Sequence, residues 1–276
     1  MNSKLIFLDI DGTLTEPGQN TPPDSALLAI RKAQAAGNRV FLCTGRNLAM
    51  LQPLLRYGFD GVVASAGGYV TCGDQVIYDC PMPSQDVVDA MKILKESGVY
   101  RTVECLHATY TDSGLGDFLA GTEGVAVNSE LIRWREACSK KLDMRPMEEY
   151  AGEPVYKIVI MCNEEAQLLP ARARLEQDYL FCIQDKANQS FLNGELIYRA
   201  FDKGRGIRRV CEALGVSLSD TYGFGDGMND IEMFRTVGTS VCMANGSTHL
   251  KKLASNVCPA VTEDGLYRAF QDLELF

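Results

Sequence analysis

The sequence predicts an α/β protein in which a doubly wound parallel sheet is interrupted by an inserted α/β module. Short apolar runs alternate with segments of helical periodicity at both ends of the chain, a pattern typical of parallel sheets. Polar residues follow these runs directly, at the carboxyl ends of the expected strands, where such sheets bind ligands. A length of 276 residues is also enough for two units of ordinary size.

The first part of the chain is expected to form a β-α-β unit. Residues 4–10 (KLIFLDI) and 38–43 (NRVFLC) are short apolar runs, and residues 22–36 between them have helical spacing. The segment Pro81-Met82-Pro83 predicts a stiff linker at the end of this part. The elements expected before that linker are a helix over 47–57, a strand over 61–65 and short strands around 67–70 and 75–78.

The middle of the chain forms the expected insert, and the βα pattern returns after it. Residues 155–162 (VYKIVIMC) predict a central strand of the insert. Its other expected elements are helices over 84–97 and 164–178 and strands over 179–184 and 190–198. From Lys203 we expect helices over 203–214, from 229, over 246–254 and from 264, with strands over 221–225 and 239–243. The predicted domains are a core of residues 1–81 and 199–276 and an insert of residues 82–198.

Composition narrows the class of protein. Hydrophobic residues make up 46% and charged residues 23%, as in an ordinary globular protein. The net charge of −9 argues against nucleic acid or an anionic membrane surface as a partner. The N-terminus lacks the apolar region of a signal peptide, and the ten cysteines are scattered without a CxxC pair. We therefore expect reduced thiols in a cytoplasmic protein.

The polar residues at the expected strand ends form one chemical set. They supply four carboxylates, a hydroxyl and an ammonium group. Oxygen ligands of this kind suit Mg²⁺, while lysine and threonine suit phosphoryl oxygens. The residues are Asp9, Asp11, Thr44, Lys203, Asp226 and Asp230.

The Asp9-Ile10-Asp11-Gly12 segment is the strongest signal in this set. Side chains alternate along an extended strand, so the two acids point the same way and Ile10 points the other way. One carboxylate can then act as a nucleophile while the other exchanges a proton. Gly12 allows the chain to turn at this point.

Several motifs together resemble the haloacid dehalogenase (HAD) superfamily, and specifically its Cof-type hydrolases with a type IIB α/β cap. The motifs are DIDGTL (9–14), TGR (44–46), Lys203-Gly204, GDGMND (225–230), the tail 241–254 with Asp264-Gly265, and Glu195-Leu196. The resemblance implies a Rossmann-like core. It also implies a Mg²⁺-dependent phosphatase that acts on small phosphorylated metabolites, with sugar phosphates as candidates, through an aspartyl-phosphate.

The resemblance implies a role for each matching residue. Asp9 would be the nucleophile and Asp11 the general acid and base. Phosphate or substrate would be bound by Thr44, Gly45, Arg46, Lys203 and Asn229. Mg²⁺ would be held by the carboxylates of Asp9, Asp226 and Asp230 and by the backbone carbonyl of Asp11. The inserted cap would act as a lid that reads the leaving group.

Some of these residues also have simpler interpretations. Thr44 fits a turn or helix cap, Asp230 fits an acid in the first turn of a helix, and Arg46 fits equally an ion pair with a nearby acid. Ala66 stands where many Cof-type proteins carry asparagine, so one polar group is missing there.

Two other functions remain open at this stage. A phosphosugar mutase would use the same aspartyl-phosphate chemistry, and the motifs do not separate it from a phosphatase. A non-catalytic, receiver-like module would also gather acids, a threonine and a lysine, but such modules are about half this length. No P-loop and no dinucleotide fingerprint is present. The expected partner is a small phosphorylated metabolite, and the expected state is a monomer or a weak homo-oligomer.

Overall fold

The computed structural model describes residues 3–120, 132, 135, 144–183 and 191–276. The chain divides into two compact units. The first unit, called the core below, consists of Met1–Arg46, Leu51–Asp79 and Phe201–Phe276. The second unit, called the insert below, consists of Asn47–Met50 and Cys80–Ala200. Both ends of the chain therefore contribute to the core, and the predicted α/β class is confirmed.

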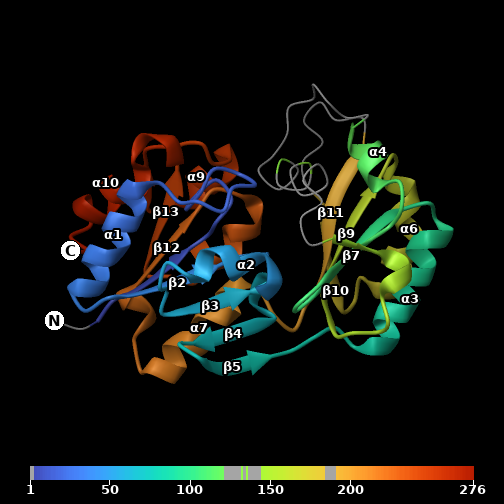
Figure 1. Ribbon diagram of the computed structural model, residues 1–276, viewed down its shortest axis with the longest axis horizontal. Coiled ribbons are helices and arrows are strands. Elements are labelled where there is room, and N and C mark those ends of the chain that lie inside the picture. The colour runs from blue at the N-terminus through green and yellow to red at the C-terminus, as the bar shows by residue number, and fades with distance from the viewer. Residues whose placement is uncertain (1–2, 121–131, 133–134, 136–143, 184–190) are drawn as a thin grey trace. The chain divides into compact units, whose positions relative to one another are not determined.

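The core holds an eight-stranded sheet. Its strands are β1 (Leu5–Leu8), β2 (Arg39–Cys43), β3 (Gly61–Ala64), β4 (Tyr69–Cys72), β5 (Gln75–Asp79), β12 (Thr221–Gly225), β13 (Thr239–Met243) and β14 (Asn256–Cys258). Their order is β14-β13-β12-β1-β2-β3-β4-β5. β1 pairs in parallel with β12 and β2, whereas β4 and β5 form an antiparallel pair at one edge (Figure 1). The strand ends that follow β1, β2 and β12 are therefore neighbours.

Helices cover both faces of this sheet. The helices are α1 (Asp24–Ala35), α7 (Lys203–Leu214), α8 (Ile231–Phe234), α9 (Thr248–Leu253) and α10 (Gly265–Asp272). A further helix, α2 (Leu48–Leu55), begins in residues assigned to the insert and ends in the core. Phe7 of β1 shares an apolar cluster with Ile207 of α7. Phe224 of β12 pairs in register with Leu8, on the opposite face from Phe7, and contacts Phe270 of α10. Burial on both faces explains why these strands are continuous apolar runs.

Residues at both ends of helix α7 explain where it begins and where it ends. The Asp202 carboxylate accepts a hydrogen bond of 2.7 Å from the Arg205 backbone N–H and so caps the first turn. Gly215 ends the helix in the left-handed conformation, with φ of 64°. The cap fixes Lys203 as the first helical residue.

The insert holds a six-stranded sheet of mostly antiparallel pairs. Its elements are α3 (Ser84–Glu96), β6 (Tyr100–Cys105), β7 (Thr109–Thr111), α4 (Leu115–Ala120), β8 (Met144–Pro146), β9 (Val155–Cys162), α6 (Leu169–Leu175), β10 (Tyr179–Ile183) and β11 (Leu192–Tyr198). The strand order is β10-β11-β9-β6-β7-β8, and β7 and β8 form a parallel pair.

Alternating residues of β9 face two different apolar clusters. Ile158 and Ile160 share a cluster with Ala90 of α3. Val159 and Met161 belong to a second cluster together with Leu115 of α4. The central strand of the insert is therefore buried on both faces, as its unbroken apolar sequence predicts.

An ion cluster lies inside the insert. Lys157 of β9 places its Nζ 2.6 Å from Glu195 Oε1 and 3.3 Å from Glu104 Oε2. All three residues are buried, and they come from three neighbouring strands, so the cluster links β6, β9 and β11 across the sheet.

Two general features concern the described residues as a whole. None of their helices combines the length and the apolar character needed to cross a membrane. The nine described cysteines are free thiols.

Candidate active site

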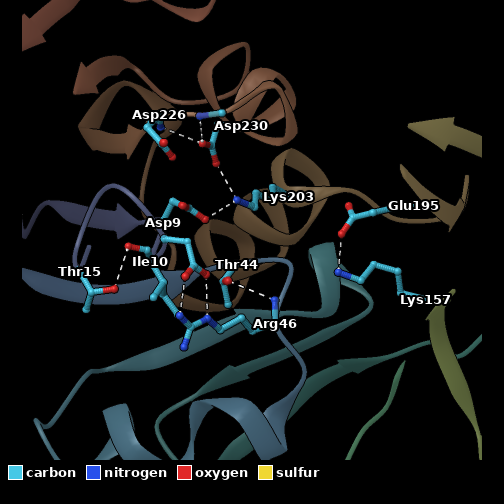
Figure 2. Close-up of polar contacts among 12 residues, drawn as sticks. Asp9, Ile10, Thr15, Thr44, Arg46, Lys157, Glu195, Lys203, Asp226 and Asp230 are labelled. Carbon is cyan, nitrogen blue, oxygen red and sulfur yellow. Dashed lines mark hydrogen bonds and ion pairs between the residues drawn. The ribbon is translucent and has the colours of Figure 1, made fainter. Parts of the chain in front are cut away.

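The carboxyl ends of β1, β2 and β12 bring the predicted site residues together within the core. Asp9 and Asp11 follow β1, Thr44 follows β2, Asp226 follows β12, and Lys203 opens α7. These five residues are all at most 8% exposed. The close-up in Figure 2 shows the Lys203 ammonium group between the carboxylates of Asp9 and Asp230.

Lys203 lies between Asp9 and Asp230 and forms an ion pair with each. Its Nζ donates hydrogen bonds to Asp9 Oδ1 at 2.7 Å and to Asp230 Oδ1 at 2.6 Å. Burial by itself would lower the pKa of the Lys203 ammonium, but the carboxylates of Asp230 and Asp9 raise that pKa well above its usual range. Lys203 therefore stays charged at neutral pH and neutralises part of the acidic cluster.

The acids are crowded in spite of this lysine. Burial raises the pKa of the Asp9 carboxyl to about 7, and the nearby Asp230 adds to the effect, while Lys203 opposes it. Burial and the charges of Asp9 and Asp230 raise the pKa of Asp226 well above its usual range. The cluster thus lacks positive charge when it contains no cation.

Asp230 also shapes the loop that carries Asp226. Its Oδ2 accepts hydrogen bonds from the backbone N–H groups of Asp226, at 3.0 Å, and Gly227, at 3.1 Å. Within the described part of the chain, no donor forms a hydrogen bond with the Asp226 carboxylate. Gly12, with φ of 87°, lies so close that a Cβ there would be 2.3 Å from Asp226 Oδ2. Only glycine fits at this position.

The residues fit a hard divalent cation. One carboxylate oxygen from each of Asp9, Asp226 and Asp230 can be chosen so that all three lie within 4.8 Å of one another. An all-oxygen donor set with excess negative charge is the kind that Mg²⁺ prefers. Such an ion would supply positive charge to three buried carboxylates beside which Lys203 is the ammonium group.

Asp11 has a separate partner. Arg46 donates to Asp11 Oδ2 through Nε at 2.8 Å and to Oδ1 through Nη2 at 2.6 Å. The backbone N–H of Gly18 donates to the same Oδ1 at 2.9 Å. The structure thus places Arg46, expected on phosphate or on an acid, on the Asp11 carboxylate.

The remaining predicted residues lie in the same loops. Thr44 Oγ1 accepts a hydrogen bond of 3.1 Å from the Arg46 backbone N–H, with Gly45 between them. Asn229 is half-buried in the short 3₁₀ helix Met228–Asp230, and its Oδ1 would be 2.6 Å from a Cβ at Gly227. The predicted site residues therefore lie at one end of the core sheet, in the segments that follow its strands and at the start of α7.

Sequence reasoning missed one residue of these loops. Asn245 Nδ2 donates to the Gly12 carbonyl oxygen at 2.7 Å, and its Oδ1 accepts from the Val261 backbone N–H at 3.1 Å. Asn245 lies in the tail segment 241–254, which the sequence marked only through its resemblance. No local pattern shows a contact between residues 233 positions apart.

The turn after β3 is a second missed feature. Ser65 and Ala66 have φ of 49° and 56°, in the left-handed region that non-glycine residues avoid. The Ala66 backbone N–H donates to the Thr44 carbonyl oxygen at 3.0 Å, which ties this turn to the site. The sequence showed only that Ala66 replaces a common asparagine, a residue that tolerates this conformation.

Comparison with known proteins identifies the family. The family model described as haloacid dehalogenase-like hydrolase matches residues 6–270. The chain belongs to this family. The predicted resemblance to the HAD superfamily is therefore confirmed.

Relatives of this HAD hydrolase are named as phosphatases. It is 30% identical over 281 residues to the "Putative phosphatase YkrA" of Bacillus subtilis (strain 168), a match that covers 100% of this chain and 99% of the relative. It is 27% identical over 255 residues to the phosphoglycolate phosphatase of Metallosphaera sedula, covering 91% and 90% of the two chains. This HAD hydrolase is accordingly a phosphatase of the family.

Solved structures share its fold over the whole chain. A protein of Geobacillus kaustophilus HTA426 is 26% identical with a TM-score of 0.79, and the match covers 100% of both chains. The HAD subclass IIB sugar phosphatase BT4131 is 24% identical with a TM-score of 0.77, covering 99% and 100%. The HAD core with an inserted cap of subclass IIB is thus the fold of this hydrolase.

Proposed function

We propose that this HAD phosphatase hydrolyses phosphate monoesters of small metabolites, sugar phosphates among them, through a phosphorylated Asp9 and with Mg²⁺. The observation that carries the proposal is the buried cluster in which Lys203 bridges Asp9 and Asp230 beside Asp226. The names of the relatives support the substrate class, since they include a sugar phosphatase and a phosphoglycolate phosphatase.

The reaction has two steps. In the first, an Asp9 carboxylate oxygen attacks phosphorus, the bond from phosphorus to the ester oxygen breaks, and Asp11 gives that oxygen its proton. In the second, Asp11 takes a proton from water, whose oxygen attacks the phosphorus of the aspartyl-phosphate. Phosphate leaves and the Asp9 carboxylate is restored.

Positive charge makes the first step feasible. Lys203 lies 2.7 Å from the nucleophile, where it can also neutralise charge on the transferring phosphoryl group. The hydroxyl of Thr44, the backbone of Gly45 and the Asn229 side chain are proposed to complete the phosphate contacts. Mg²⁺ on Asp9, Asp226, Asp230 and the Asp11 carbonyl would add the charge stabilisation typical of phosphoryl transfer.

We propose that the inserted domain of residues 82–198 recognises the leaving group of the substrate. The core holds the groups that act on phosphorus, which every phosphate monoester shares. The insert therefore supplies the part of the protein in which substrates are distinguished. We expect a monomer or a weak homo-oligomer, which sedimentation velocity tests.

Phosphate release by the purified full chain tests the proposal. The substrates are p-nitrophenyl phosphate, phosphoglycolate and a set of hexose and pentose phosphates, each with Mg²⁺ or EDTA. Turnover is expected with Mg²⁺ and should vanish in Asp9→Asn. Asp272→Asn, at the exposed end of α10, removes one charge away from the site and should keep wild-type activity. Undiminished turnover by Asp9→Asn would contradict the nucleophile, and transfer to a second sugar without phosphate release would indicate a mutase.

A further inference from the structure

The hydrogen bonds of Arg46 leave little of its guanidinium group for a substrate. Nε and Nη2 donate to the two oxygens of Asp11, Nη2 also donates to the Gln19 carbonyl at 3.3 Å, and Nη1 donates to Asn20 Oδ1 at 2.6 Å. Four of the five N–H groups are thereby occupied. The side chain is only 5% exposed.

The backbone of Arg46 is fixed as firmly as its side chain. Its N–H donates to Thr44 Oγ1 at 3.1 Å, and its carbonyl oxygen accepts from the Ser65 backbone N–H at 2.9 Å. Arg46 therefore stands between two loops of the site with its planar fork directed at one carboxylate. A fork of this kind sets the orientation of a carboxylate as well as its position.

The two buried basic side chains of the site form ion pairs with different acids. Lys203 contacts Asp9 and Asp230, whereas Arg46 contacts Asp11 (Figure 2). To reach a phosphoryl group, Arg46 would have to give up its paired hydrogen bonds with Asp11. The buried Asp11 carboxyl group would then keep only the hydrogen bond from Gly18, and a buried polar group that loses its partners is costly.

We propose that Arg46 is a positioning residue that holds the Asp11 carboxyl group in place for proton transfer, and that it is not a ligand of the substrate phosphate. The proposal rests on the proposed function. Two donors on its two oxygens fix the plane of the Asp11 carboxyl group. Arg46 thus sets the direction from which Asp11 can exchange a proton with the leaving oxygen.

The leaving group separates the two roles of Arg46. An alkyl ester such as glucose 6-phosphate needs a proton on its leaving oxygen, whereas p-nitrophenolate departs as an anion. A misplaced Asp11 therefore slows only the alkyl ester, while a missing phosphate ligand slows both. The value of kcat/KM is the right measure, because it includes departure of the leaving group and excludes the later hydrolysis of the phosphorylated Asp9.

The core offers a control for stability. Gly215 ends α7 in the left-handed conformation, twelve residues after Lys203, and no atom lies within 4 Å of a Cβ built at this position. Gly215→Ala therefore strains the backbone of the core without a new contact. It reports what a loss of stability alone does to turnover of the two esters.

The experiment compares Arg46→Gln, Arg46→Ala and Gly215→Ala with the wild type on glucose 6-phosphate, or the fastest alkyl ester of the set, and on p-nitrophenyl phosphate. In the Arg46 variants we expect kcat/KM to fall roughly 10- to 100-fold for the alkyl ester, part of the effect that positioned proton transfer provides. For p-nitrophenyl phosphate, kcat/KM should fall less than about threefold, because its leaving group needs no proton. Gly215→Ala should leave the ratio of the two kcat/KM values unchanged. Added guanidinium should restore alkyl ester turnover to Arg46→Ala.

Three results would overturn the inference. Equal losses on both esters with a raised KM would make Arg46 a phosphate ligand. Alkyl ester turnover that is unchanged or faster would remove its positioning role. An equal change of this ratio in Gly215→Ala would assign the effect to stability. Wild-type turnover that is lost in Asp9→Asn establishes the proposed function separately, so failure of that function and failure of this inference are distinguishable.

Discussion

Replacing Asp9 by asparagine should abolish activity and at the same time stabilise the metal-free protein. The pKa of the Asp9 carboxyl is raised from 3.8 to about 7, chiefly by burial. At about 1.4 kcal/mol for each pKa unit, the ionised form costs the fold about 4 kcal/mol at pH 8. That figure already includes the attraction of Lys203, whose ion pair the variant loses. Asparagine has nearly the same shape and carries no charge.

The effect depends on pH in a definite direction. The unfolded chain releases the Asp9 proton near pH 4, whereas the folded, metal-free chain holds it until about pH 7. The folded state therefore binds more protons across this interval, and the wild type loses stability as pH rises through it. Asp9→Asn does not lose stability in this way. The difference in free energy of unfolding between the variant and the wild type should therefore be larger at pH 8 than at pH 5.

Urea unfolding followed by circular dichroism measures this difference. In EDTA at pH 8, Asp9→Asn should have a free energy of unfolding higher than that of the wild type by up to about 4 kcal/mol. Mg²⁺ should stabilise the wild type more than the variant, because Asp9 is one of its proposed ligands. Asp272→Asn controls for the change in net charge. A variant no more stable than the wild type in EDTA at pH 8 would refute the reasoning.

Three further substitutions test other parts of the site. Gly12→Ala should abolish both activity and Mg²⁺-induced stabilisation, because its Cβ would lie 2.3 Å from Asp226 Oδ2 at a φ of 87°; a thermal shift by Mg²⁺ equal to that of the wild type would contradict this contact. Lys203→Met should lower the free energy of unfolding by roughly 3–5 kcal/mol in EDTA at pH 8, since it leaves buried carboxylates without their partner; a loss below 1 kcal/mol in urea unfolding would mean that the lysine contributes little. Ala66→Gly should stabilise the protein by about 1 kcal/mol, because alanine adopts φ of 56° there, and a lower urea midpoint would count against that strain.

The sequence alone was enough to predict which polar side chains lie at the ends of the core strands. Asp9, Thr44 and Asp226 each follow an apolar run, and the parallel pairing of β1 with β2 and β12 brings such positions to one edge. Lys203 was expected to begin a helix, and the structure shows that Asp202 caps that helix. Local signals of this kind act over a few residues and survive in the sequence.

Contacts set by irregular loops could not be predicted. Asn20 meets Arg46 through a loop without periodicity, and Asn245 reaches Gly12 from the far end of the chain. The expected single helix over 164–178 is a 3₁₀ turn, Glu165–Leu168, followed by α6. Pro170 lies in the first turn of α6, where its fixed φ and missing N–H favour a new helix start over a continuing helix.

The strand order of the core sheet affects how the protein folds during its synthesis on the ribosome. β1 lies at the centre of the core sheet, but its neighbour β12 begins only at Thr221. At a synthesis rate of about 5–20 residues per second, one edge of β1 stays unpaired for roughly 10–40 s. The strands of the insert, all between Tyr100 and Tyr198, emerge during that delay and can pair among themselves first. An unpaired apolar strand invites aggregation. The nascent chain is therefore most prone to aggregation before α7 and β12 emerge, and the proposed catalytic groups can meet only after Asp230 has been synthesised.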